Sequence, residues 1–252
     1  MRHAFSLVEL SIVLVILGLL TGGILTGQSL IRAAELRSVV TEFQKYQTAA
    51  RTFQQKYFAL PGDMRNATDF WGSMTNCGAA SPSGTGTQTC NGDGNGQIEG
   101  GSVAGRTSEA LSVWPHLVNA GLIEGTYTGI ALTSSSLTQA GVNIPQSKLS
   151  QGGWGLSYFD FSSGDGNNFA YNYRNHFGFG AQGTGNSLAR IMAPSELWGI
   201  DTKIDDGKPG MGKVIAVYYG TCTTAANQTD FAASYKLTDE SIACGIRFKD
   251  IF

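Results

Sequence analysis

The feature that most constrains the fold is an apolar run from Phe5 to Ile31 that contains a single charged residue, Glu9. A helix needs about 20 apolar residues to cross a bilayer, and this run is long enough to do so. A carboxylate inside such a segment costs roughly 2.5–3.5 kcal/mol even on permissive insertion scales, so a charge retained there is expected to have a function. The run therefore predicts a membrane helix whose functional residue is Glu9.

The helical pattern continues beyond the apolar run. No proline occurs between Phe5 and Leu60, and Pro61-Gly62-Asp63 then ends the pattern. Between Arg32 and Phe58, apolar residues recur at the spacing of one face of an amphipathic helix. The sequence therefore predicts one helix of roughly 50 residues, about 80 Å long at its usual rise. The apolar face consists of Leu36, Val39, Val40, Phe43, Tyr46, Ala50, Phe53 and Tyr57.

The segment Ala4-Phe5-Ser6-Leu7-Val8-Glu9 follows a short basic leader, Met1-Arg2-His3. It resembles the class III signal of type IV pilins and type II secretion pseudopilins. The resemblance implies that a prepilin peptidase cleaves between Ala4 and Phe5 and methylates the new amino group of Phe5. It also implies that Glu9 neutralises the N-terminal ammonium of a neighbouring subunit during filament growth. The family strongly prefers Gly before the cleavage site, whereas this chain has Ala4.

The resemblance also implies an order of parts along the chain. Residues 1–4 would be the leader, 5–31 the transmembrane and assembly half of the helix, 32–60 its amphipathic half, and 61–252 a globular head. The head would lie in the periplasm and the helix in the inner membrane until the subunit enters a filament. The expected partners are the prepilin peptidase, other pilin or pseudopilin subunits and the inner membrane.

The function that this resemblance implies is that of a structural subunit, minor or specialised, of a type IV pilus or type II secretion pseudopilus. The alternative is a minor pilin whose head is a binding or adhesion module. A third class, a membrane-anchored enzyme, is not expected. The sequence has no Gly-x-Ser-x-Gly elbow, no His-Glu-x-x-His motif and no phosphate loop.

Three other interpretations of the apolar run compete with the pilin one. A conventional secretory signal would place Glu9 inside its hydrophobic region and would not continue as a helix past the cleavage site. An uncleaved membrane anchor fits the length of the run. A buried core helix fits less well, because the run is apolar on every face.

Composition narrows the function of the remaining 200 or so residues, which are enough for one domain with its own core. The formal net charge is −2, and Lys and Arg are not clustered. A nucleic-acid partner is therefore not expected.

The four cysteines are expected to form disulfides, because the chain carries an export signal and their number is even. Three pairings are possible. Proximity in the sequence favours Cys77 with Cys90 and Cys222 with Cys244. The second loop resembles the disulfide-bounded C-terminal region of type IV pilins.

The head is predicted to combine an irregular insertion with a small sheet. Residues 73–105, rich in Gly, Ser, Thr and Asn, predict a surface loop. Thr107 is expected to cap a helix that ends at Gly121, and Pro194 to open another over Ser195–Ile204. Four strands are expected to form an antiparallel meander with one face on the amphipathic helix, which makes the fold class α+β. They are Leu156–Phe161, Phe169–Tyr173, Val214–Tyr219 and Ile242–Phe248.

One candidate metal site is the segment Asn91–Glu99. Oxygen-bearing side chains occupy positions 1, 3, 5 and 9 of a calcium loop, as Asn91, Asp93, Asn95 and Glu99. Position 12, which should hold a bidentate Glu, is Ser102, so the loop would need an oxygen from elsewhere. A polar turn without metal is the alternative.

A second candidate site is an acidic cluster formed by Asp201, Asp205 and Asp206 near a predicted helix end. It resembles the acidic loop of major pseudopilins, in which calcium holds the loop near the C-terminus. Carboxylates this close repel one another by about 1 kcal/mol per pair in water. A calcium ion would relieve that repulsion, and Lys203 or Lys208 is the alternative.

Overall fold

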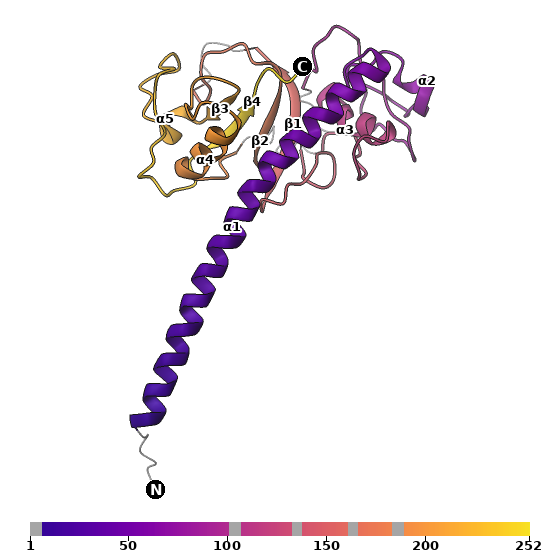
Figure 1. The fold of residues 1–252 in the computed structure, drawn as a ribbon. Coiled ribbons are helices and arrows are strands. Elements are labelled where there is room, and N and C mark those ends of the chain that lie inside the picture. Colours follow the sequence, from indigo (N-terminus) through magenta and orange to yellow (C-terminus); the bar gives the residue numbers. More distant parts are fainter. Residues whose placement is uncertain (1–6, 101–106, 133–137, 161–165, 183–188) are drawn as a thin grey trace.

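A computed structural model of the chain describes residues 7–100, 107–132, 138–160, 166–182 and 189–252. A long helix, α1, carries a head on its C-terminal half, and its N-terminal half extends away from the head (Figure 1). The described part of the head contains a four-stranded antiparallel sheet and four short helices. The predicted α+β class, a long N-terminal helix packed on an antiparallel sheet, is confirmed.

Helix α1 runs from Leu7 to Tyr57 and has 51 residues, which corresponds to roughly 77 Å at the usual rise per residue. The residue that follows it, Phe58, adopts a left-handed conformation with φ of 53°. The Phe58 N–H donates to the Gln54 carbonyl at 2.9 Å, a bond that closes the last turn of many helices. The single uninterrupted helix predicted from the sequence is therefore confirmed, and it ends just before Pro61.

The face that α1 turns toward the head is the predicted apolar stripe. Phe43 stacks on Phe248 of the last strand with ring centroids 4.2 Å apart, and Tyr46 contacts both Trp114 and Trp154. Burying a side chain of this size contributes about 1.5–3 kcal/mol. The head is therefore held along this stripe by its own core. The buried residues of α1 are Val39, Phe43, Tyr46, Ala49, Ala50 and Phe53.

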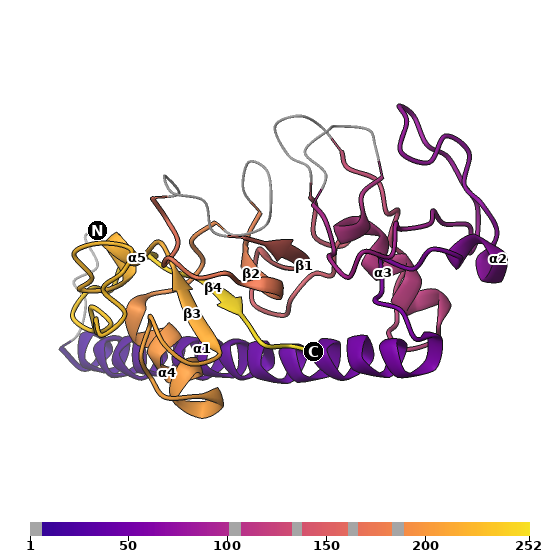
Figure 2. The ribbon, with the colours of Figure 1, turned by 90° about the horizontal axis from the view of Figure 1, so that it is seen from above.

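The four strands pair antiparallel in the order β1-β2-β4-β3, beside the C-terminal half of α1 (Figure 2). Their bounds are Gly152–Phe159 for β1, Arg174–Ala181 for β2, Val214–Val217 for β3 and Gly245–Phe248 for β4. Glu42 of α1 ties the helix to the first strand, because its carboxylate accepts hydrogen bonds from Trp154 Nε1 at 2.8 Å and Lys148 N at 3.0 Å.

Two predictions about the sheet are wrong. The second strand is Arg174–Ala181, whereas Phe169–Tyr173 lies outside the strands. The true strand alternates Phe177 and Phe179 with glycines, and such a pattern has low strand propensity until it is packed. The meander is also wrong, because β4 pairs with both β2 and β3 and so separates them. The other predicted strands are shorter than expected at one end or shifted along the chain by a few residues.

The four short helices are α2 (Ala67–Trp71), α3 (Glu109–Asn119), α4 (Pro194–Ile204) and α5 (Tyr219–Cys222). Helix α4 begins at the predicted proline. Helix α3 is preceded by Ser108 at its N-cap and not by Thr107. Along α1 the head is elongated, with α4 and α5 at one end and α2 at the other (Figure 2).

Candidate functional sites: the projecting helix and two acidic loops

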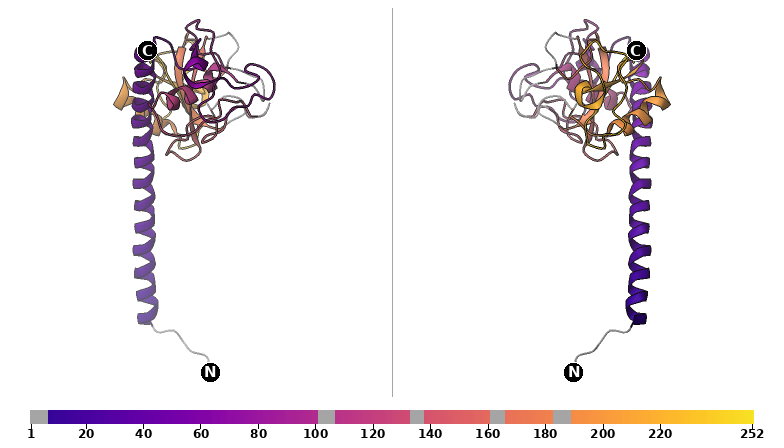
Figure 3. Two further views of the ribbon diagram at one scale, coloured as in Figure 1. Left: turned by 90° about the vertical axis from the view of Figure 1, so that its right-hand side faces the viewer. Right: turned by 90° about the vertical axis from the view of Figure 1, so that its left-hand side faces the viewer.

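The N-terminal half of α1 is the first candidate site, because it lies outside the head (Figure 3). Its large apolar side chains, from Leu7 to Ile31, are between 49% and 85% exposed. Among the described residues, α1 is the one helix long and apolar enough to cross a membrane. A segment this apolar and this exposed gains stability only by entering a bilayer or packing against other chains.

The hydroxyl groups of this projecting half are already satisfied within the helix. Ser11 donates to Val8 O at 2.8 Å, and Thr21 donates to Leu17 O at 2.9 Å. Thr26 and Ser29 do the same, each to a backbone carbonyl three or four residues before it, at 2.9 Å. A hydroxyl bonded in this way adds little cost in hydrocarbon, where water offers no partner. The polar residues here are thus compatible with a membrane.

Glu9 lies in the first turn of α1 and is exposed. A carboxylate near a helix N-terminus is stabilised by the helix dipole. The predicted cleavage residues Ala4 and Phe5 lie outside the described residues. The roles assigned to Ala4, Phe5 and Glu9 therefore stay predictions.

The projecting half ends at a charge pair that joins α1 to the head. Arg32 donates to both carboxylate oxygens of Glu196 at the start of α4, at 2.6 and 2.8 Å. Burial alone would raise the pKa of Glu196, but the bonds from Arg32 and the Ala193 N–H outweigh it and lower that pKa. This bidentate pair holds α4 against α1 where the helix leaves the head.

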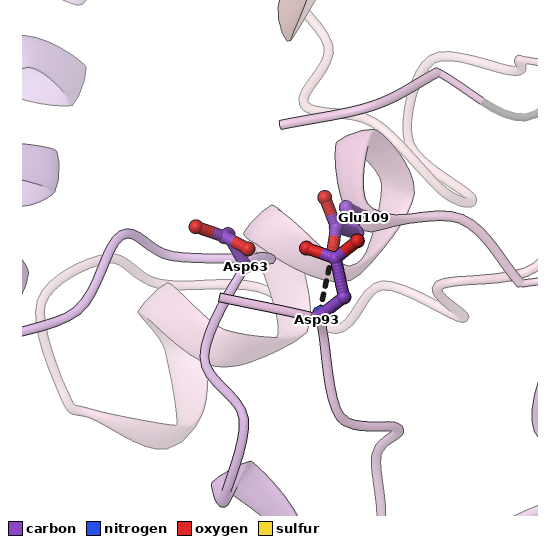
Figure 4. Close-up of side chains that lie close together, drawn as sticks. All are labelled: Asp63, Asp93 and Glu109. Carbon is purple, nitrogen blue, oxygen red and sulfur yellow. Dashed lines mark hydrogen bonds between the residues drawn. The ribbon is translucent and has the colours of Figure 1, made fainter. Parts of the chain in front are cut away.

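The first acidic loop brings together three carboxylates from three segments (Figure 4). Asp63 follows α1, Asp93 lies in the predicted calcium loop, and Glu109 is the first residue of α3. One carboxylate oxygen from each lies within 4.8 Å of the other two. Carboxylate oxygens are the ligands that calcium prefers, so this set fits a hard cation by donor type.

Asp63 is nearly buried and organises the loop. Its carboxylate accepts backbone hydrogen bonds from Gly94, Asn95 and Gly96. Gly92 packs so closely on the backbone of Gly62 and Asp63 that a Cβ there would collide with it. The glycines of this loop therefore allow the backbone to wrap around one carboxylate.

The charge of this cluster is poorly compensated by the protein itself. Burial is the main cause that raises the pKa of Glu109 to about 8, and its contact with Glu99 adds to the effect. Burial also raises the pKa of Asp63, against the effect of its three N–H donors. Converging carboxylates whose ionisation is disfavoured are what a bound cation would stabilise.

Of the four residues predicted as ligands in this loop, Asp93, Asn95 and Glu99 lie together, whereas Asn91 is engaged elsewhere. Asn91 Oδ1 accepts a hydrogen bond from Thr68 N at 2.8 Å, which engages it at the start of α2. Asn95 donates to Asp93 at 3.1 Å and to Glu99 at 2.8 Å. Ser102, at position 12, lies outside the described residues.

Sequence reasoning missed Asp63 and Glu109 as members of this cluster. They are 30 and 16 residues from Asp93, so no local spacing connects them to the loop. A usable signal was that the loop lacks its last ligand while Glu109 opens a predicted helix. The Glu109 carboxylate accepts from the N–H groups of Asp93 and Glu99 at 2.8 and 3.1 Å.

The second acidic loop keeps its three predicted members together. Asp201, Asp205 and Asp206 have one carboxylate oxygen each within 4.8 Å of the others. Asp201 is fully buried and accepts from Tyr235 Oη at 2.7 Å. Burial, with a smaller contribution from the neighbouring aspartates, raises the pKa of Asp201 to about 7 against the hydrogen bonds from Tyr235 and Gly207. The ion pairs of the described residues involve neither Lys203 nor Lys208.

Both predicted disulfides are present in the structure. Cys77 is bonded to Cys90 across a separation of 13 residues, and Cys222 to Cys244 across 22. Loops of this length stabilise a fold by about 3 kcal/mol each in the chain-entropy model. The first disulfide closes the insertion, and the second anchors the start of β4 to α5.

Comparison of the chain with protein-family models, with curated proteins and with solved structures finds no match. Function is therefore inferred from the residues and their geometry.

Proposed function

We propose that this protein is a filament subunit of the type IV pilin or type II secretion pseudopilin kind. In this proposal a prepilin peptidase cleaves the chain between Ala4 and Phe5 and methylates Phe5. Before assembly the subunit lies in the inner membrane with its head in the periplasm. It then enters the filament through the N-terminal half of α1. The protein has no catalytic role.

The observation that carries this proposal is the division of α1. One half is buried along the head by a stripe of apolar residues, and the other half projects with apolar residues on all sides. A single rigid helix with these two halves can anchor a head in a membrane and later pack with copies of itself. A removable signal peptide has no need to continue into the core of the mature domain.

Glu9 supports assembly over simple anchoring. An anchor gains nothing from a carboxylate in its hydrophobic segment, and it bears the cost of inserting that group. Pairing with the N-terminal ammonium of a neighbouring subunit offsets the cost only when subunits meet. The carboxylate thus favours a helix that leaves the lipid for a protein environment.

Mass spectrometry of the mature N-terminus tests this proposal. Protein purified from a host with a prepilin peptidase should begin at N-methyl-Phe5. The same chain from a host lacking that peptidase should keep residues 1–4. A mature chain that begins after Gly22 would instead identify the segment as a conventional signal peptide.

A further inference from the structure

The end of the head farthest from the projecting helix presents aromatic rings to solvent. Phe58 is 93% exposed and Phe70 is 56% exposed. Tyr57 and Trp71 pack beside Phe70, with ring centroids 5.4 and 5.9 Å from it. We call Phe58 and Phe70, with their flanking residues, the aromatic end.

Phe58 is difficult to explain by folding alone. It occupies the left-handed position that terminates α1, where glycine is the usual residue because it has no Cβ. Its ring gains nothing from the core because it is almost fully exposed. At this position both the left-handed backbone and the exposure of an apolar ring to water are unfavourable for phenylalanine. Its presence is better explained by a contact with another molecule.

The opposite end of the head has a cavity of about 380 Å³ where α1 leaves the head. Its wall includes the apolar residues Ile191, Ala193 and Ile242, the Arg32–Glu196 pair, and the charged residues Arg190 and Glu240. Ile242 is 54% exposed. The Arg190 guanidinium already lies 4.8 Å from the centroid of the Tyr218 ring. Aliphatic side chains beside an arginine form a suitable surface for a phenyl ring.

Both ends also expose charges of both signs. Asp69 and Arg65 are exposed near the aromatic end, and Arg190 and Glu240 are exposed at the cavity. Opposite charges therefore pair across the contact when the two ends meet. Such charge pairs fix the relative position of two subunits more than they raise the affinity between them.

The two surfaces lie at opposite ends of one axis. Arg32 and Phe58 are 26 residues apart along α1, which corresponds to roughly 39 Å at the helical rise. A second copy that lies beside the first, with its α1 parallel and displaced along the axis by that distance, brings its cavity to the level of the first copy's aromatic end. Different patches on each copy make a heterologous contact, which repeats without closing and so builds an open filament.

We propose that the aromatic end of one subunit docks into the Arg190–Ile242 cavity of the next copy of this chain along the filament. This inference rests on the proposed function and specifies which surfaces of the heads meet. Phe58 is the central side chain of the contact.

Cysteine cross-linking of the full chain in assembled filaments tests this contact. All four native cysteines are in disulfides, so only the introduced thiols react with a cross-linker. Asp69→Cys and Ser241→Cys place one exposed thiol beside Phe70 and one beside Ile242. With a short bismaleimide, the doubly substituted chain should give a ladder of multimers, and neither single variant should.

Phe58→Gly in the doubly substituted chain then tests the central residue. Glycine relieves the left-handed conformation, so the melting temperature should stay the same or rise while the ladder falls at least tenfold. Leu237→Ser, which removes an apolar side chain 49% exposed outside both surfaces, should leave the ladder unchanged.

The outcomes separate this inference from the proposed function. Filaments visible by electron microscopy without a ladder would overturn the contact and leave the filament role intact. A ladder that Phe58→Gly does not weaken would also overturn the proposed contact. It would indicate that the aromatic end binds another ligand, such as a surface saccharide. Absence of filaments from the chain with an unaltered N-terminal helix would refute both.

Discussion

At the scale of single residues, His116 shows how burial sets a charge state in the head. Its Nδ1 accepts from the Gly62 N–H at 2.9 Å, and its Nε2 lies 3.2 Å from the Cys90 carbonyl. The ring is fully buried, and burial lowers its pKa to about 4 although the Cys90 carbonyl opposes the shift. Neutral His116 therefore links the end of α1, helix α3 and the disulfide-closed insertion.

His116 should make the head sensitive to acid. Its pKa is near 6.5 in the unfolded chain and lower in the folded one, so its contribution is complete above pH 6.5 and is lost as the pH falls toward 4. The loss amounts to about 3 kcal/mol at most by that linkage. Urea unfolding of wild type and His116→Gln at pH 7 and pH 4.5 measures it. The stability difference between the two proteins should shrink at the lower pH, and a constant difference would contradict the assignment.

Glu9 is the residue on which assembly is expected to depend. Glu9→Gln keeps the size of the side chain and removes its charge. A charge pair at 4 Å near a protein surface contributes about 4 kcal/mol, so incorporation into filaments should fall more than tenfold while the amount in the membrane stays normal. Immunoblots of sheared filaments and of membranes measure both quantities. Ser11→Ala, two residues away on the same projecting half, is the matched control and should assemble normally.

At the scale of structural elements, the two acidic loops join elements that lie far apart in the chain. Asp63, Asp93 and Glu109 connect the end of α1, the insertion and α3. Asp205 at the end of α4 accepts from the backbone N–H groups of Lys213 and Val214, at the start of β3. A cation in either loop would cross-link these elements.

Calcium is expected to raise the melting temperature of the protein. Binding to the folded state at ten times Kd adds roughly 1.4 kcal/mol, which corresponds to about 3–6 °C for a domain of this size. Melting in millimolar calcium and then in chelator measures the shift. Asp93→Asn should abolish it if the first loop binds, and Asp206→Asn if the second does. Superimposable curves in calcium and chelator would leave both loops as polar turns.

At the scale of the whole molecule, the projecting half of α1 does not contribute to the hydrophobic core of the head. The first buried residue of the helix is Val39, and the hydrophobic core consists of Val39 and residues after it, with Leu36 packed against its edge. The projecting half and the head therefore share one continuous helix, but the core of the head packs without the projecting half.

Removing residues 1–31 should accordingly leave a folded, soluble head. The truncated protein should keep both disulfides and unfold cooperatively, because its apolar stripe stays covered by the sheet and α3. Near-ultraviolet circular dichroism and size-exclusion chromatography test this. Removing residues 1–45 is the contrasting variant and should fail to fold, since it deletes Val39 and Phe43. Aggregation of the shorter truncation would mean that the projecting half supports the head.

The sequence by itself determined the parts of this protein that depend on local pattern. The long helix follows from an unbroken apolar run and a stripe at helical spacing, and it ends where Pro61 must end it. The two disulfides join cysteines that are neighbours in the chain. The start of α4 follows from Pro194. In each case the physical cause lies within a few turns or a short loop.

Tertiary structure alone decided what depends on distant segments. Strand β4 pairs with β2 and β3 because its register places Phe248 on Phe43, which no local pattern encodes. The glycine-rich β2 becomes a strand only between two partners. Asp63 and Glu109 join Asp93 because the insertion folds back on the end of α1. Such contacts are set by the packing of the whole head, since the residues involved lie too far apart in the chain for spacing to connect them.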